Sequence, residues 1–232
     1  TPPIVINDTY MDDRDAGILY LGNGKIMVSW FTHSTYSYLN KYRQAIINDA
    51  GDNARQMVTG ALEDYKALPE EDQLGGSYLR ISEDYGVTWS ETIYLPITAP
   101  HGPTLCKDGS LIYLGIETYE TDRIRFRKLT GGNENASLYR SRDGGYTWTP
   151  PYPVINTPLD DRDAGIVKTG DNLIVTSFNN SRDRQRFYAD KGKYPTEKRA
   201  FVEAYLNLGS DEDEKKYLGA TLAVSHDGGN TF

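Results

Sequence analysis

The sequence predicts an all-β protein made of repeated four-stranded antiparallel units, and three kinds of repetition predict it. A seven-residue segment, DDRDAGI, occurs at residues 12–18 and again at residues 160–166. The pattern Ser-x-Asp-x-Gly-x-Thr, followed by an aromatic residue, occurs at residues 82–89, 141–148 and 225–232. Paired apolar runs precede each copy of this pattern. Repetition at this scale is the signature of one supersecondary unit used several times.

The paired apolar runs predict the first hairpin of each unit. Residues 17–31, 102–115 and 165–178 each hold two apolar stretches around a turn rich in Gly, Asn or Asp. A connection, a third strand, the eight-residue pattern and a fourth strand complete the unit. Four antiparallel strands are the content of one β-propeller blade. We place the blades at about 10–97, 98–155 and 156–232, with residues 3–6 as a candidate closing strand of the last blade.

The eight-residue pattern predicts a tight turn between the last two strands of each blade. Its aspartate (Asp84, Asp143 or Asp227) can accept hydrogen bonds from nearby backbone N–H groups, as Asx turns do. Its glycine supplies the positive φ that such a turn needs. The aromatic residues, Trp89, Trp148 and Phe232, are expected to fold back as anchors. These residues therefore indicate architecture and not catalysis.

Long insertions interrupt the first and third blades. Apolar residues recur at three- and four-residue spacing within residues 40–73, so part of this insertion is expected to be helical. Residues 180–217 repeat the pattern in the third blade. Insertions of this length in a compact fold are more often functional than not.

The composition excludes several classes of protein. A net charge of −8 argues against a nucleic-acid partner, because phosphate binding needs a cationic face. No segment approaches the roughly 18 apolar residues of a membrane-spanning helix. The single cysteine excludes a disulfide framework and a cysteine-built zinc site. We expect no metal and no cofactor.

The three eight-residue patterns resemble the Asp-box, or BNR repeat, and the chain resembles the sialidase superfamily of six-bladed propellers. The strand starts Arg-Asp-Ala-Gly and His-Gly-Pro make it most similar to bacterial secreted sialidase-like glycoside hydrolases. The resemblance implies half of a six-bladed sialidase-like β-propeller with helical insertions. It also implies an exo-glycosidase acting on a terminal acidic sugar, secreted or periplasmic, and monomeric once the ring is complete. In the family the Asp-boxes lie away from the active site, so they indicate the fold alone.

Candidate substrate-binding residues lie where the first strand of each blade begins, because these ends open on the binding face of a propeller. Sialidases are similar in using arginines there to grip the substrate carboxylate. Arg14 stands at the matching place, followed by Asp-Ala-Gly instead of the family's Ile-Pro. A guanidinium binds a carboxylate through two parallel hydrogen bonds and stays charged. We assign substrate binding to three residues: Arg14, His101 and Arg162.

Candidate acid/base groups are the aspartates beside these arginines, Asp15 and Asp163. The resemblance adds Asp49, because sialidases carry an acid/base aspartate in a loop after the first hairpin. The family nucleophile is a tyrosine assisted by a glutamate, an exception among glycosidases. Both are expected in later blades.

Each of these residues has a structural alternative. Arg–Asp pairs often hold neighbouring strands together, and using one heptapeptide twice suits a structural corner. Asp15 and Asp163 can orient an arginine or cap a turn, and His101 can be a structural histidine. Two functional alternatives also stay open. One is a neutral-sugar propeller glycosidase, such as an exo-arabinanase, that uses two carboxylates. The other is a non-catalytic propeller that binds glycan or protein.

Overall fold

A computed structural model describes most of the strands and one helix of the chain. The described residues are 2–9, 11, 13–32, 51–69, 72, 75–117, 136–155, 157, 160–180, 212, 215–216 and 218–232. They form two compact units, and each is described by itself. The first unit contains the described residues up to Gly102, and the second contains those from Pro103 onward.

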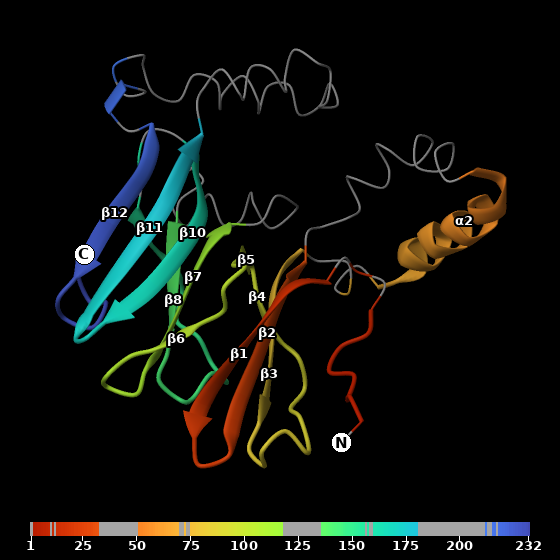
Figure 1. The fold of residues 1–232 in the computed structure, drawn as a ribbon, viewed down its shortest axis with the longest axis horizontal. Coiled ribbons are helices and arrows are strands. Elements are labelled where there is room, and N and C mark those ends of the chain that lie inside the picture. The colour runs from red at the N-terminus through yellow and green to blue at the C-terminus, as the bar shows by residue number, and fades with distance from the viewer. Residues whose placement is uncertain are drawn as a thin grey trace. The chain divides into compact units, whose positions relative to one another are not determined.

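The elements follow one another in chain order (Figure 1). The first unit contains β1 (Asp13–Gly22), β2 (Lys25–Thr32), α2 (Gly51–Ala67), β3 (Gly76–Ser82), β4 (Ile93–Leu95) and β5 (Ile97–Thr98). The second unit contains β6 (Thr104–Leu105), β7 (Leu111–Glu117), β8 (Ala136–Ser141), β9 (Tyr152–Ile155), β10 (Asp160–Thr169), β11 (Asn172–Asn180) and β12 (Gly219–Ser225).

The first unit is built on one antiparallel sheet with the strand order β1-β2-β3-β4. Its first hairpin closes at the pair Gly22–Lys25, with Asn23 and Gly24 as the two turn residues. Both turn residues have positive φ, 51° and 83°. Such a turn matches the right-handed twist of the strands, and Asn-Gly is its preferred sequence. The predicted hairpin is thus confirmed, with the turn centred on Asn23-Gly24.

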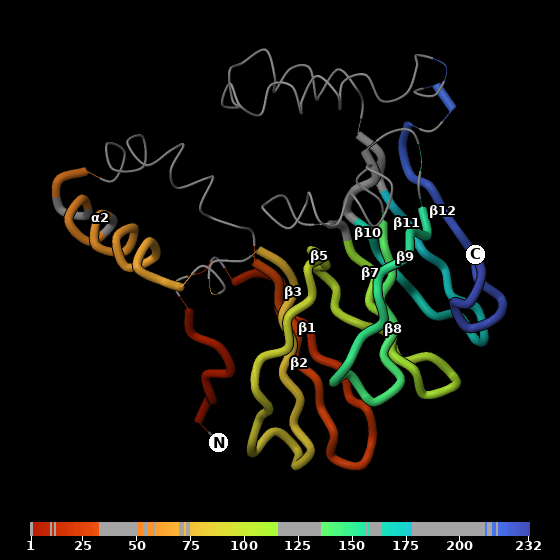
Figure 2. Tube along the Cα trace, turned by 180° about the vertical axis from the view of Figure 1, so that it is seen from behind, coloured from red at the N-terminus to blue at the C-terminus, as the bar shows by residue number. Residues whose placement is uncertain are grey.

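The second unit contains two antiparallel sheets, which Figure 2 shows as a tube. In one, β6 pairs with β7, β7 with β8, and β8 with β9. In the other, the order is β10-β11-β12. Side chains from both sheets form a common core that includes Ile112, Leu138, Leu173 and Val175, each at most 2% exposed. The prediction of an all-β fold built from antiparallel blade sheets is therefore confirmed.

Each eight-residue pattern forms the same hydrogen-bonded turn. In the first, Asp84 Oδ1 accepts from the backbone N of Val87 (3.1 Å) and of Thr88 (2.8 Å), and from Ser82 Oγ (2.8 Å). Its second oxygen accepts from Thr88 Oγ1 at 2.6 Å. Asp143 and Asp227 make equivalent contacts in the other two turns. The predicted role of the aspartates is confirmed.

The backbone of these turns explains their glycines. The predicted glycines have φ values of 87° at Gly86, 104° at Gly145 and 85° at Gly229. The residue before each of them also has positive φ, including Tyr85 at 62°. Two consecutive left-handed residues create the concave loop that surrounds the aspartate.

The aromatic anchors behave as predicted in two of the three turns. The indole nitrogen of Trp89 donates to the carbonyl of Gly86 at 3.2 Å, and that of Trp148 donates to Gly145 at 2.8 Å. Phe232 has no N–H group to donate, and it stays 37% exposed. The anchor role of Phe232 therefore stays a prediction.

The charged turns predict how stability depends on pH. Asp84 accepts hydrogen bonds inside its turn, and these lower its pKa to about 2. The bond from the Thr88 hydroxyl has the largest effect. The Thr147 hydroxyl and the Thr231 backbone N–H likewise hold the pKa of Asp143 and of Asp227 far below the usual range. Unfolded aspartates titrate near pH 3.9, so the unfolded chain binds more protons between about pH 4 and 2. We expect the free energy of unfolding to be constant above pH 5 and to fall as the pH drops through this window.

Urea unfolding at pH 6, 4, 3 and 2.5 measures this effect. Asp84→Asn should reduce the slope between pH 4 and 2.5, whereas Asp64→Asn, on the exposed side of α2, should leave it unchanged. An equal slope in wild type and Asp84→Asn would contradict the assignment.

Other expectations have mixed outcomes. The helix predicted inside residues 40–73 is confirmed as α2, which buries Leu62 and Tyr65. Residues 3–6 form no strand within the part of the chain that the structure describes, so their closing role stays a prediction. The predicted helical part of residues 180–217 lies almost entirely outside the described residues. Among the helical residues described, none form a helix long and apolar enough to cross a membrane.

Candidate functional site

The repeated heptapeptide forms a β-bulge at the start of β1. Arg14 pairs with Phe31 and Gly17 pairs with Ser29, so Asp15 and Ala16 both lie opposite the single residue Trp30. Asp15 has a φ of 45°, in the left-handed region that Asp tolerates better than most residues. Bulges of this kind re-aim side chains and are common next to active sites.

The bulge decides on which face of the sheet Arg14 lies. Side chains alternate along a regular strand, so Arg14 and Gly17 would lie on opposite faces without the extra residue. In the observed register both pair with odd-numbered residues of β2, which share one face. Arg14 therefore lies on the same face as Gly17 and Ser29, and it is exposed.

His101 lies at this same corner of the first unit, because its loop packs on the strand start. A Cβ added at Gly17 would lie 2.8 Å from Ser29 Oγ and 3.8 Å from the carbonyl oxygen of His101. A Cβ added at Gly102, whose φ is +68°, would lie 2.5 Å from the same Ser29 Oγ. Both glycines are needed for this close approach. The structure thus brings the Arg-Asp-Ala-Gly and His-Gly-Pro motifs together around Ser29.

The imidazole of His101 is available to a ligand. The residue is exposed, and within the described ranges its ring makes no hydrogen bond or ion pair. Arg14, Asp15 and His101 are thus exposed residues of two segments whose backbones meet at this end of the first sheet. This corner is at the far end of the sheet from the Asp-box turn, which packs on the β1–β2 turn through a hydrogen bond from Tyr85 N to Gly24 O.

Asp13 has a structural role that the sequence reasoning did not assign. One of its carboxylate oxygens accepts from Asn7 Nδ2 at 2.7 Å and from Thr9 Oγ1 at 3.1 Å. Its backbone N donates to the carbonyl of Met11 at 3.0 Å. Asp13 thereby ties the segment before β1 to the strand start.

A row of aromatic residues supports the opposite face of the same corner. Trp30 stacks on Tyr78 with ring centroids 5.9 Å apart, and Tyr78 lies 5.3 Å from Tyr94. Burial raises the pKa of Tyr78 to about 12, against the opposing effect of its hydrogen bond with Thr32. Burial of Tyr78 within this row therefore favours its protonated hydroxyl. The signal that could have revealed this row is the presence of an aromatic residue on three successive strands.

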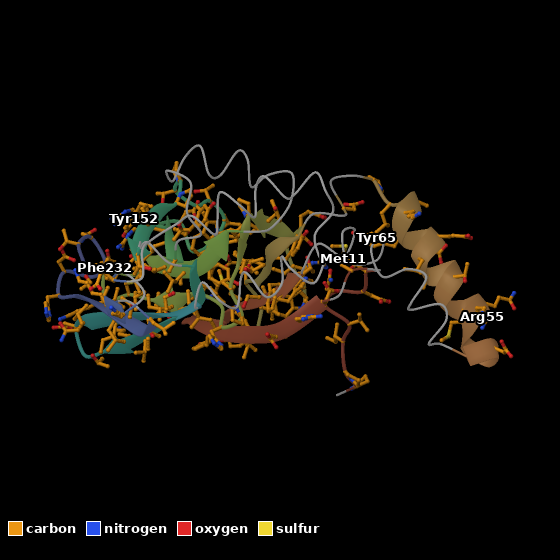
Figure 3. The ribbon with its side chains drawn as sticks, turned by 90° about the horizontal axis from the view of Figure 1, so that it is seen from above. Met11, Arg55, Tyr65, Tyr152 and Phe232 are labelled. Atoms are coloured by element: carbon orange, nitrogen blue, oxygen red, sulfur yellow. The ribbon has the colours of Figure 1, made fainter. Side chains whose placement is uncertain are left out.

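The helix α2 buries apolar side chains in its last turns. Leu62 and Tyr65 are 5% and 2% exposed, whereas Arg55 near the start of the helix projects outward (Figure 3). In Figure 3, Tyr65 is drawn near Met11, the residue that precedes the strand start.

The second copy of the heptapeptide repeats the bulge in the second unit. Arg162 pairs with Phe178 and Gly165 pairs with Thr176, so Asp163 and Ala164 share one partner position. The backbone of Arg162 and Asp163 therefore has the same register as that of Arg14 and Asp15. This explains why the seven residues occur twice. Asp49 lies outside the described residues, and its acid/base role stays a prediction.

The described residues offer no place for a metal centre. Groups of three or more His, Cys, Asp or Glu side chains close enough to hold an ion do not occur among them. At the Arg14 corner, the groups to consider are the side chains of Arg14, Asp15 and His101. They can bind an anionic, hydroxyl-rich ligand and exchange a proton with it.

Comparison with known proteins identifies the turn motif. Residues 139–150 match the family model described as the BNR/Asp-box repeat. No curated protein sequence matches the chain.

Solved structures with similarity to the chain share little sequence with it. A Dyadobacter fermentans protein of unknown function is 15% identical, with 73% of this chain and 44% of that one covered and a TM-score of 0.44. A Penicillium chrysogenum α-L-arabinanase complexed with arabinobiose is 16% identical, with coverage of 71% and 40% and a TM-score of 0.38. A Hadza microbial sialidase is 18% identical, with coverage of 74% and 30% and a TM-score of 0.36.

The chain spans less than half the length of each of these proteins. It contains a BNR/Asp-box repeat, and its repeated antiparallel sheets agree with the predicted resemblance to the sialidase-like superfamily.

Proposed function

We propose that this chain supplies part of the substrate site of an exo-glycoside hydrolase that acts on the terminal acidic sugar of a glycan. The observation that carries the proposal is the bulge at Asp15 and Ala16. It brings Arg14 to the face where the His101 loop packs, at the end of the sheet away from the Asp-box turn.

Each side chain has a distinct role in this proposal. Arg14 binds the sugar carboxylate through two parallel hydrogen bonds. His101 donates to, or accepts from, a hydroxyl group of the sugar or of the leaving group. Asp15 exchanges a proton with the reacting oxygen, as general acid and then general base. The nucleophile is expected in later blades, and no described residue is proposed for it.

The repeated bulge extends the proposal to the second copy of the heptapeptide. Arg162 and Asp163 have the register of Arg14 and Asp15, so we propose a second arginine and a second carboxylate for the same kind of ligand. We further propose that the protein is secreted or periplasmic, where glycans are accessible, and that it acts as a monomer.

A panel of fluorogenic substrates tests the proposed function with the longest natural form of the protein. We expect release from a sialoside at a rate at least 100-fold above that from an α-L-arabinofuranoside. Release from the arabinofuranoside alone would establish the neutral-sugar alternative and overturn the proposal. Binding of sialic acid without any release would instead establish a non-catalytic glycan-binding propeller.

A further inference from the structure

A cavity lies in the second unit, at the end that carries the Asp-box turns. It has a volume of about 340 Å³, within the range of small-molecule sites. Three turns enclose it: the one between β6 and β7, the one between β10 and β11, and the third Asp-box turn. Its floor contains Leu173 and Cys106, which are 2% and 5% exposed. The cavity therefore has an apolar floor and a polar rim.

The carboxylates on the rim are already engaged by the protein. Asp227 accepts four hydrogen bonds inside its own turn. Asp171 forms an ion pair with Lys107, with Nζ 2.9 Å from Oδ1. Asp108 accepts from the backbone N and the hydroxyl of Ser110, at 3.0 and 2.6 Å, and it lies 3.5 Å from Arg142. A cationic ligand would have to displace one of these partners.

The basic residues Lys168 and His226 on the rim have fewer protein partners than the carboxylates. Lys168 lines the cavity and makes no ion pair or hydrogen bond with any residue that the structure describes. His226 also lines it, and its Nδ1 lies 2.8 Å from Asn172 Oδ1, which leaves Nε2 for a ligand. Because the three lining aspartates and Lys107 are already engaged, Lys168 is the charged lining group that is left for the anionic group of a ligand.

The cavity walls are held rigidly in place. Arg140 donates from Nη1 to Ser110 Oγ at 2.7 Å and from Nη2 to the carbonyl of Gly228 at 2.8 Å. It thereby joins the β6–β7 turn to the third Asp-box turn. Tyr152 donates its hydroxyl to the carbonyl of Gly229, next to the cavity. A pre-formed site loses little conformational entropy when a ligand binds.

We propose that this cavity binds a monosaccharide-sized ligand that carries one carboxylate or sulfate group, with Lys168 as the residue that recognises the anion. The floor of Leu173 and Cys106 contacts the apolar face of the ligand, and His226 contacts a hydroxyl group. The cavity is lined by residues of the second unit and Arg14 belongs to the first, so the proposal does not depend on the proposed catalytic function.

Calorimetric titration with four probes tests the site: glucuronate, glucose 6-sulfate, glucose and inorganic sulfate. We expect glucuronate or glucose 6-sulfate to bind at least tenfold more tightly than glucose and inorganic sulfate. Lys168→Gln should weaken this binding about tenfold or more, as expected for the loss of a charge-assisted hydrogen bond. Lys66→Gln is the matched control, because it removes one exposed positive charge from α2.

The only cysteine of the chain reports where the ligand binds. Cys106 lines the cavity, so a bound ligand should slow its alkylation by iodoacetamide at least threefold, measured by intact mass. The proposal would be overturned by equal affinity for glucose, by equal weakening in Lys168→Gln and Lys66→Gln, or by an unchanged alkylation rate at saturation. Equal affinity for inorganic sulfate would show a simple counterion effect and would also overturn it. The rate of glycoside hydrolysis is measured in a separate assay. It is expected to be the same in Lys168→Gln as in the wild type.

Discussion

Arg140→Ala is expected to lower the free energy of unfolding by about 3 kcal/mol, the largest effect of any single substitution considered. The Arg140 side chain is only 7% exposed and donates to Ser110 and to Gly228. Its removal takes a donor from the buried Ser110 hydroxyl and from the partly buried carbonyl of Gly228, and it opens a cavity between two turns. For a chain of this length the expected fall in melting temperature is roughly 8 °C.

Arg142→Ala is the matched control for this prediction. Arg142 is 64% exposed and lies 3.5 Å from Asp108, and an exposed ion pair contributes about 0–1 kcal/mol. Thermal and urea unfolding of both variants measure the difference. Equal stability of the two variants would show that Arg140 does not join the turns.

Arg14→Ala is expected to lower kcat/KM for the acidic-sugar substrate about 100-fold. A charge-assisted, two-pronged contact with a carboxylate contributes about 3 kcal/mol, and each 1.36 kcal/mol is a factor of ten in rate. Because Arg14 is exposed, its removal should change the melting temperature by less than about 2 °C. Arg14→Lys should recover only part of the activity, since an ammonium group cannot bind through two parallel bonds.

Arg55→Ala, on the outward-projecting start of α2, controls for the loss of one positive charge. It should leave kcat/KM unchanged. A fall in melting temperature of more than about 5 °C in Arg14→Ala, without a selective loss on the acidic substrate, would instead assign Arg14 a structural role.

The Asp-box turns were predictable in detail because their interactions are local. Every donor to Asp84 lies within four residues of it, so the pattern of residue types already contains the hydrogen bonds. The same holds for the Asn23-Gly24 turn. Phe232 differs, because it lacks the indole N–H that makes the anchoring hydrogen bond in the other two turns.

The bulge was visible only as an unexplained repetition. Its cause is the register between two strands, in which Asp15 and Ala16 face one residue of the partner. Register depends on residues distant in sequence, and neither copy of the heptapeptide contains that information. The packing of Gly17 and Gly102 around Ser29 is non-local in the same way.

The sequence did not reveal the structural role of Arg140, although a comparison of the three repeats singles this residue out. The residue before the serine of each Asp-box is Ile81 in the first blade and Val224 in the third, but arginine in the second. A charged residue at a position that is otherwise apolar indicates a buried partner. That partner, the carbonyl of Gly228, is 88 residues away and could be found only in the structure.

The central claim is that the strand-start corner around Arg14 binds the acidic group of the substrate. A crystal structure of the protein with the sugar acid bound tests it most directly. The claim predicts a sugar carboxylate within hydrogen-bonding distance of both terminal nitrogens of Arg14, with a ring hydroxyl near His101. A sugar bound elsewhere, with Arg14 paired only to carboxylates of its own chain, would contradict it.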